Sequence, residues 1–292
     1  MSIDESGLPR IPLEDPFRQL FCSSSGFQEG RGRLIGRRVL IVGAGQRPTP
    51  DPVPTIGNGR AMSLLFVREG AEVICADSRI DSAQDTVDLV LASGGQARAV
   101  EADVSDPLAI QRMFDRSLEI MGSLDAVLVN VGIASGNSLV SETADDWDRV
   151  LNVNLRAHML IGQRGLSAIT PGGAILFISS LAAQSPAGKN PAYEASKAAL
   201  SALCRAVALE GQVRGIRANA LAPGLLDTPM GRAASERQPS RAARPLPFGR
   251  QGTAWEMAYV ALFLISTEAS YVNAQTIFVD GGLGSGVAMA TR

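Results

Sequence analysis

Histidine is almost absent from this sequence of 292 residues, and lysine and cysteine are scarce. His158 is the only histidine, which nearly excludes histidine-based catalytic triads and histidine-rich metal sites, so no metal ion is expected. Cys22, Cys75 and Cys204 are scattered without a Cys-x-x-Cys spacing. This pattern favours a reduced compartment and argues against both a disulfide framework and a zinc site.

Strong net charge and long apolar runs are also missing. The formal net charge of −2 leaves no basic footprint for a nucleic acid. No run of ~18 apolar residues is present, so no segment is expected to span a membrane. The N-terminal stretch lacks a basic start and an apolar core, so it is not expected to act as a secretion signal, and a cytoplasmic protein fits best.

Lysine is kept at only two positions. Lys189 and Lys197 are the only lysines among 27 basic residues, the rest being arginines. Arginine cannot replace lysine where a compact ammonium on a flexible stem is required. The two lysines are therefore candidates for positions that need such a group.

What is abundant is a regular alternation of short apolar, β-branched runs with amphipathic segments, beginning at Arg38. This alternation is typical of βαβ units and a parallel sheet. It predicts one doubly wound, Rossmann-like α/β domain with a seven-stranded parallel sheet over residues 36–292. The polar segment 1–35 is expected to be an extension that lies on the surface or on a neighbouring subunit. Strands are expected at 39–43, 71–77, 97–103, 125–130, 173–179, 216–222 and 276–280, and helices near 59–69, 81–93, 107–121, 144–166, 191–212 and 253–266.

Two segments are expected to be loops. Residues 48–54 carry alternating prolines, and 231–245 are polar and lie within an expected flexible lid over about 229–250. Between Met230 and Phe248 the lid has few apolar anchors and one acid, Glu236, against four arginines. These arginines either solvate a loop or attract an anionic substrate, and the sequence leaves both interpretations open. They are Arg232, Arg237, Arg241 and Arg244.

The first expected strand runs into a glycine-rich stretch. Gly43, Gly57 and Gly59 are placed to form a turn that cradles a pyrophosphate at a helix N-terminus, although such turns also serve as plain connections. Asp77 ends the second strand, 18 residues after Gly59. A carboxylate there is placed to bind an adenosine ribose, or alternatively to cap the next helix.

A tyrosine and a lysine stand four residues apart in Tyr-Glu-Ala-Ser-Lys, so Tyr193 and Lys197 share one helix face. A phenol with its ordinary pKa of about 10 is a poor base at neutral pH. A neighbouring ammonium favours the phenolate and lowers that pKa. The pair is therefore a candidate general acid–base, the alternative being two side chains that pack together by chance.

The Tyr193–Lys197 pair and several further motifs make the chain resemble the short-chain dehydrogenase/reductase family over about residues 38–283. The family has a serine 13 residues before the tyrosine, where Ser180 stands, and an asparagine in a Val-Asn-Leu segment, where Asn154 stands. The stretch 216–230 and the ending Phe-Val-Asp-Gly-Gly at 278–282 also match. The chain departs from the family at Val42, which replaces a threonine, at Val131, and by about ten extra residues between the first two glycines.

The resemblance implies that Tyr193 is the general acid–base and that Lys197 lowers its pKa and holds the nicotinamide ribose. It implies that Ser180 orients the reacting oxygen and that Asn154 holds a water linked to Lys197. It also implies a cofactor site made of Gly43, Gly57, Asn58, Gly59, Asp77, Asp103, Val104, Asn130, Gly132, Tyr193, Lys197, Pro223, Gly224 and Thr228.

The function expected from these residues is NAD-dependent interconversion of a small-molecule secondary alcohol and a ketone. The alternatives are an NADPH-dependent 3-oxoacyl-thioester reductase, which Asp77 disfavours, and a non-catalytic dinucleotide-sensing or scaffold protein, which usually lacks part of the catalytic set. The insertion 46–56 is expected to skirt the adenosine end of the cofactor. Family resemblance further implies a homotetramer that packs through the helices of Asn154 and Tyr193.

Overall fold

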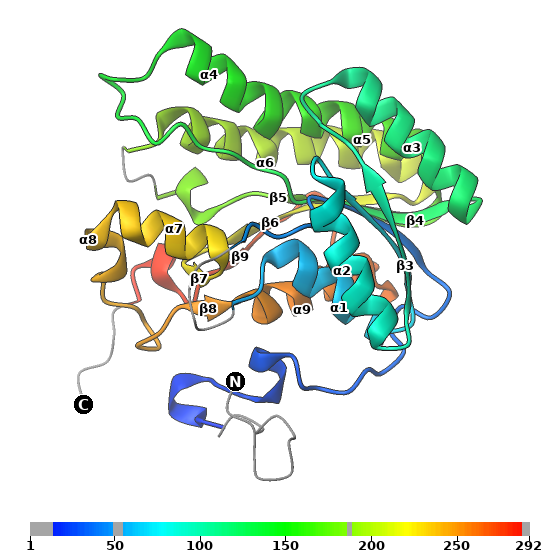
Figure 1. The fold of residues 1–292 in the computed structure, drawn as a ribbon, viewed down its shortest axis with the longest axis horizontal. Coiled ribbons are helices and arrows are strands. Elements are labelled where there is room, and N and C mark those ends of the chain that lie inside the picture. Colours follow the sequence, from blue (N-terminus) through cyan, green and yellow to red (C-terminus); the bar gives the residue numbers. More distant parts are fainter. Residues whose placement is uncertain (1–13, 49–54, 186–188, 288–292) are drawn as a thin grey trace.

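A parallel sheet of seven strands forms the centre of the computed structural model, which describes residues 14–48, 55–185 and 189–287 (Figure 1). The strand order is β3-β2-β1-β4-β5-β6-β9, and every neighbouring pair is parallel. The predicted doubly wound α/β fold is confirmed. The strands are β1 (Arg38–Val42), β2 (Glu72–Asp77), β3 (Gln96–Glu101), β4 (Leu124–Val129), β5 (Ile169–Ile178), β6 (Arg217–Pro223) and β9 (Thr276–Val279).

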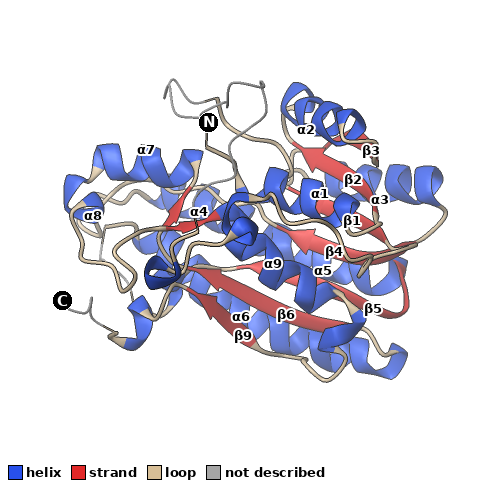
Figure 2. Cartoon of the chain, turned by 90° about the horizontal axis from the view of Figure 1, so that it is seen from below, coloured by secondary structure: helices blue, strands red, loops and turns tan. Residues whose placement is uncertain are grey.

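The central strands are apolar on both faces because helices cover both sides of the sheet (Figure 2). One face packs against α1 (Asn58–Arg68), α2 (Ile80–Ala92) and α9 (Ala254–Ile265). The other packs against α3 (Pro107–Met121), α5 (Ala157–Ala168) and α6 (Pro191–Gly211). Two separate apolar cores result, one on each side of the sheet, and they hold the strand ends in fixed positions.

One predicted helix, 144–166, is interrupted in the structure. It divides into α4 (Ala144–Leu151), a π-helical turn (Asn152–Arg156) and α5. A π-turn widens the helix by one residue, and such turns are frequent at functional sites. Asn154 lies in the middle of this turn.

The prediction that 231–245 is a loop is wrong. The segment contains α7 (Pro229–Arg237) and α8 (Pro239–Ala242), which lie beyond the strand ends in Figure 2. Thr228 caps α7 by accepting a hydrogen bond from the Gly231 amide at 3.1 Å, and each helix begins with a proline, whose missing N–H costs nothing there. A short parallel pair, β7 (Leu226–Asp227) with β8 (Gly252–Thr253), joins the two ends of the lid. Most of the other expected loop, 48–54, lies outside the described residues.

Residues 14–35 of the N-terminal extension pack against the same chain, beside α9 (Figure 1). The Arg250 guanidinium donates to the carbonyls of Arg18 and Gln19 at 2.8 and 2.7 Å and forms an ion pair with Glu256 of α9. Further along, Leu34 is buried in the core under α1 and α9.

Glu69, directly after α1, fastens the end of this extension. Its carboxylate is fully buried and accepts hydrogen bonds from the Arg31 and Arg33 amides and from the Arg33 guanidinium, at 2.9, 3.1 and 2.6 Å. Burial alone would raise the pKa of Glu69, but these donors outweigh it and lower the pKa below its usual value. The stability this carboxylate contributes is therefore present above about pH 4.5 and is lost as the pH falls through the lowered pKa.

We expect Glu69→Ala to lower the free energy of unfolding by about 2–3 kcal/mol near neutral pH, because buried amides and a guanidinium lose their acceptor. Chemical denaturation measures this loss. Glu29→Ala is the matched control, since Glu29 is an exposed acid of the same extension. Equal stability of the two variants would show that Glu69 does not fasten the extension.

Candidate active site

Ser180 and Tyr193 meet at the carboxyl edge of the sheet. Ser180 follows β5, and its hydroxyl accepts a hydrogen bond from the Ala182 amide at 3.2 Å, which fixes its position at the start of a short 3-10 turn. Tyr193 lies in the first turn of α6, with Ser180 close enough to influence the ionisation of its hydroxyl. Burial raises the pKa of Tyr193, whereas Ser180 and the charge of Arg241 lower it.

Lys197 lies one helical turn further along α6, buried behind the tyrosine. Its ammonium donates to the carbonyls of Ile178 and Val131 at 2.8 and 3.2 Å, and its Nζ lies 5.8 Å from the centre of the Tyr193 ring. Burial lowers the pKa of Lys197 from its ordinary value to about 7. An ammonium has three N–H groups, so one donor remains for a further partner.

Asn154 connects the π-turn to the segment that follows β4. Its amide oxygen accepts from the Ile133 N–H at 2.8 Å, and its amide nitrogen donates to the Ile133 carbonyl at 2.8 Å and to the Ser196 hydroxyl at 3.1 Å. Ser196 in turn donates to the Tyr193 carbonyl at 2.7 Å. Asn154 therefore holds the Gly132–Ile133 backbone beside α6.

Gly132 gives the lysine its space. A Cβ atom at this position would lie 3.2 Å from the Lys197 Nζ and 3.8 Å from the Asn154 Oδ1. The 3.2 Å contact would require the lysine to shift by a few tenths of an ångström, and a buried ammonium held by two carbonyls has little freedom to do so. Gly132 thus lies between Asn154 and Lys197, and Tyr193 lies beside Lys197 and Ser180.

Two of the expected roles remain predictions. Ser180 and Arg241 are the groups that lower the Tyr193 pKa here, so the expected effect of Lys197 on that pKa stays a prediction. The side-chain amide of Asn154 is engaged by protein partners, so its expected water stays a prediction.

The glycine-rich turn packs backbone against backbone. A Cβ on Gly59 would lie 2.0 Å from the Gly43 carbonyl oxygen, and Gly43 itself has a φ of +85°, a conformation that favours glycine. The Asn130 side chain donates to the Gly43 carbonyl at 2.8 Å and fixes the turn against β4. This packing brings the N-terminus of α1 to the carboxyl edge of the sheet.

The N-terminus of α1 fits a phosphate group. Gly57 provides no side-chain cap, so the first-turn amides of α1 are directed toward a ligand. The Oδ1 atom of Asn58 is buried and has no hydrogen-bond partner among the described residues. An uncapped helix start with an unpartnered polar atom beside it is the arrangement that a pyrophosphate would complete.

The side chain of Gln46 connects the two described ends of the long insertion. Gln46 accepts from the Gly57 amide at 2.7 Å and donates to the Thr55 carbonyl at 3.1 Å. The Thr55 hydroxyl donates to the Asp227 carbonyl at 2.9 Å, so this end of the insertion contacts the base of the lid. Residues 49–54, which carry the rest of the expected course, are outside the described part of the chain.

Asp77 stands at the end of β2, next to the glycine-rich turn. Its two carboxylate oxygens accept from the Gly45 and Arg79 amides at 2.9 and 3.1 Å. A Cβ at position 45 would lie 2.7 Å from the carboxylate. Asp77 therefore braces the turn, and as it is only partly buried it still faces the cleft.

The remaining expected cofactor residues also line this edge. Asp103 is exposed after β3, and Val104 beside it is buried. Pro223 ends β6, and Gly224 packs so closely on Asp280 that a Cβ would lie 2.5 Å from the Asp280 Cβ. Thr228, by contrast, is buried and occupied in capping α7.

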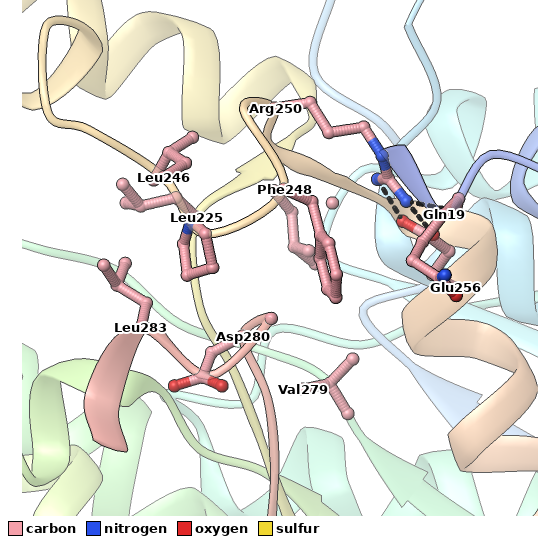
Figure 3. Close-up of a pocket in the computed structure, with 13 residues that line it drawn as sticks. Gln19, Leu225, Leu246, Phe248, Arg250, Glu256, Val279, Asp280 and Leu283 are labelled. Atoms are coloured by element: carbon pink, nitrogen blue, oxygen red, sulfur yellow. Dashed lines mark hydrogen bonds and ion pairs between the residues drawn. The ribbon is translucent and has the colours of Figure 1, made fainter. Parts of the chain in front are cut away.

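A cavity of about 180 Å³ lies apart from the tyrosine, between the lid base and the segment after β9 (Figure 3). Leu225, Phe248 and Leu283 supply much of its apolar wall. Its polar groups already have partners: Asp280 accepts from two backbone amides, and Arg250 is paired with Glu256. The charged side chains of this cavity are therefore already engaged by protein partners.

Two absences concern the part of the chain that the structure describes. In it, no helix combines the length and the apolar character needed to cross a bilayer. No cluster of three or more histidine, cysteine, aspartate or glutamate side chains in that part is arranged to hold a metal ion. His158 packs against Phe177 in the core, and burial followed by the charge of Lys197 lowers its pKa well below the usual value.

Comparisons with known proteins identify the group to which the chain belongs. A family model described as enoyl-(acyl carrier protein) reductase matches residues 55–284. A 3-oxoacyl-[acyl-carrier-protein] reductase of Thermotoga maritima is 34% identical over 255 residues, covering 86% of this chain and 99% of that protein. A 3beta-hydroxysteroid dehydrogenase of Eggerthella lenta is 34% identical over 257 residues, covering 86% and 94%. A solved short-chain dehydrogenase/reductase from Serratia marcescens has a TM-score of 0.78 at 27% identity, covering 86% and 99%.

The chain belongs to the short-chain dehydrogenase/reductase family. It is an oxidoreductase, and its relatives act on CH–OH groups with nicotinamide dinucleotides. The family resemblance carried by the Tyr193 and Lys197 motif is thereby confirmed.

Three features of this short-chain dehydrogenase/reductase could not be found by reading its motifs. Ser196 links Asn154 to the tyrosine backbone, and only its place inside the Tyr-Glu-Ala-Ser-Lys motif hinted at a role. Gly45 accommodates the Asp77 carboxylate although it lies outside the expected glycine set. Arg241 lies near the phenol, which no spacing in the sequence indicated.

Proposed function

We propose that this chain interconverts a secondary alcohol and a ketone, with Tyr193 as the general acid–base and NAD as the hydride carrier. The observation that carries the proposal is the placement of Ser180 beside the Tyr193 hydroxyl, with the buried Lys197 Nζ 5.8 Å from the centre of the Tyr193 ring. The bound nicotinamide supplies hydride chemistry, and the protein supplies position and charge. Screening a panel of secondary alcohols for reduction of NAD and of NADP tests the proposal.

In the direction of oxidation, Ser180 and Tyr193 hold the substrate hydroxyl between them. Tyr193 removes its proton, and Ser180 donates to the oxygen on which negative charge develops. Both groups are fixed by their own backbone contacts, so they are preorganised for the reaction.

Lys197 balances the charge of the phenolate. Its pKa of about 7 means that it gains or loses a proton readily near neutral pH. Formation of a phenolate within the same buried site favours the charged ammonium, so the two groups support each other's ionisation. The remaining N–H of Lys197 is available for a ribose hydroxyl.

Asp77 supports NAD over NADP. Its carboxylate stands beside the glycine-rich turn, where a 2′-phosphate would meet a like charge. An NADPH-dependent 3-oxoacyl-thioester reductase is the second candidate, because the Thermotoga maritima relative is named a 3-oxoacyl-[acyl-carrier-protein] reductase. A non-catalytic role is disfavoured by the intact catalytic set.

We expect kcat/KM with NAD to exceed that with NADP by about 100-fold or more. The Asp77 carboxylate would repel the 2′-phosphate of NADP, and the phosphate would also lose part of its hydration on binding. Asp77→Asn keeps an acceptor for the Gly45 amide but removes the charge, and should reduce the preference about tenfold or more. Steady-state kinetics with both cofactors measures the change.

Asp81→Asn is the control for this substitution, since Asp81 is an exposed acid in the first turn of α2. It should leave the cofactor preference unchanged. A wild-type preference for NADP would contradict the assignment and favour the second candidate.

We also propose that the chain acts as a homotetramer in the cytoplasm. The support is family resemblance together with exposed apolar side chains on the helices concerned, Met159 on α5 and Leu209 on α6.

A further inference from the structure

One arginine of the lid differs from the others. Arg232 forms a two-point ion pair with Asp227, with distances of 2.6 and 2.8 Å. Arg237 and Arg244 are exposed. Arg241 is partly buried, and no carboxylate pairs with it among the described residues.

The Arg241 guanidinium is held in place by one of its three nitrogens. Nη1 donates to the Gly231 carbonyl at 2.9 Å and to the Ser235 hydroxyl at 2.6 Å, both on α7. The Nε and Nη2 edge has no partner among the described residues. In Arg232 the same edge binds the Asp227 carboxylate at two points. Arg241 therefore presents, already oriented, the edge that this lid uses to bind a carboxylate.

Arg241 lies on α8, beyond the strand ends (Figure 2), and its charge and that of the catalytic tyrosine influence each other. Tyr193 is the one ionisable group that raises the Arg241 pKa, while burial lowers it. The reciprocal effect, a lowering of the Tyr193 pKa by Arg241, is also present. The guanidinium is only partly buried, so its unpartnered edge is open to a ligand, and a bound anion would offset the cost of its partial desolvation.

We infer that Arg241 binds the carboxylate of the substrate, so that the alcohol is a hydroxy acid and the ketone an oxo acid. The inference rests on the proposed function and adds the substrate class to it. The lid then has two separate tasks. Its exposed arginines solvate the helices, and Arg241 reads a negative charge on the molecule whose hydroxyl lies between Ser180 and Tyr193.

Matched substrates test the inference. Hydroxy acids with the hydroxyl on the second, third or fourth carbon are compared with their methyl esters, using the cofactor that the chain prefers. We expect at least one acid to be oxidised with a higher kcat/KM than its ester. Arg241→Gln should lower the acid-to-ester ratio of kcat/KM about 30- to 100-fold, the effect of losing charge-assisted hydrogen bonds.

The ratio is the measured quantity because any effect of Arg241 on the Tyr193 pKa acts on both substrates equally. Arg244→Gln, at an exposed position of the same lid, should leave the ratio unchanged. Arg241→Lys keeps the charge but loses the two-point contact, so its ratio should fall between those of the wild type and Arg241→Gln. Esters oxidised as well as the acids, or an unchanged ratio in Arg241→Gln, would overturn the inference.

A binding measurement separates this inference from the proposed function. Butyrate and the neutral butyramide are titrated into the protein by calorimetry, with the reduced cofactor present. Butyrate alone should bind, and Arg241→Gln should abolish its binding. If no alcohol is oxidised while butyrate still binds through Arg241, the anion site stands and the proposed reaction fails. If alcohols are oxidised but butyrate binds equally to the variant, the reaction stands and the anion site fails.

Discussion

Tyr193→Phe is expected to lower kcat by about 100- to 10,000-fold, the range over which a positioned proton donor or acceptor contributes to catalysis. The substitution removes only the hydroxyl beside Ser180, and the ring keeps its place next to Lys197. Cofactor affinity should change less than about threefold, since no charge or ring contact is lost. Steady-state kinetics gives kcat, and fluorescence titration gives the dissociation constant of the cofactor.

The chain supplies its own control for this substitution. Tyr271 is fully exposed, so Tyr271→Phe makes the same chemical change away from the site and should leave both quantities unchanged. A Tyr193→Phe variant that retained more than about a tenth of wild-type kcat would show that another group moves the proton.

The sheet could be predicted from the sequence because its strands are buried on both faces. Val39–Val42 in β1 and Ala126–Val129 in β4 form continuous apolar runs, which are typical of central strands in a parallel sheet. Asp77 ends β2, and Asn130 and Ser180 follow β4 and β5. Because parallel strands share a direction, the sequence predicted that these three residues lie at one edge of the sheet. For these residues the local pattern and the global fold agree.

The lid could not be predicted because its helices depend on contacts that composition does not reveal. α7 and α8 are polar, and they are stabilised by the Thr228 cap and by Arg241 donating back to α7. Polar segments with proline and glycine read as loops when no apolar face is present. The charge effect of Arg241 on Tyr193 depends on this tertiary arrangement, and the place of Arg241 in the sequence carries no signal for it.

The N-terminal extension was difficult for the same reason. Its polar, irregular sequence hides specific partners, such as the backbone carbonyls of Arg18 and Gln19 that Arg250 binds. A Cβ on Gly26 would lie 2.3 Å from the Trp255 ring, so shape complementarity at a single glycine sets how closely the segment approaches α9. Backbone contacts of this kind leave no periodic pattern in a sequence.

Lys197→Arg is expected to lower kcat by about 100-fold or more, because a displacement of about 1 Å at a catalytic group has that effect. The Lys197 Nζ is enclosed by the carbonyls of Ile178 and Val131 and by Gly132, where even a Cβ atom would lie 3.2 Å away. A planar guanidinium does not fit this space, so it would displace the Tyr193 ring or the Gly132 backbone.

The same substitution should change how stability depends on pH. Burial lowers the pKa of Lys197 from 10.5 to about 7, so between these values the unfolded chain binds a proton that the folded chain does not. This group therefore makes the wild-type protein more stable as the pH rises from about 7 to about 10.5, whereas an arginine stays charged throughout. The stability deficit of Lys197→Arg, measured by chemical denaturation without cofactor, should thus be larger at about pH 9 than at about pH 6.

Lys189→Arg is the control, since Lys189 is the only other lysine and is exposed. It should match the wild type in kcat and in stability at both pH values, because a solvated ammonium and a solvated guanidinium are nearly equivalent there. A Lys197→Arg variant with near wild-type kcat would show that a positive charge alone suffices at this position. A deficit that did not grow with pH would show that Lys197 keeps its proton in the folded state, and that the phenolate or another anion already compensates its burial.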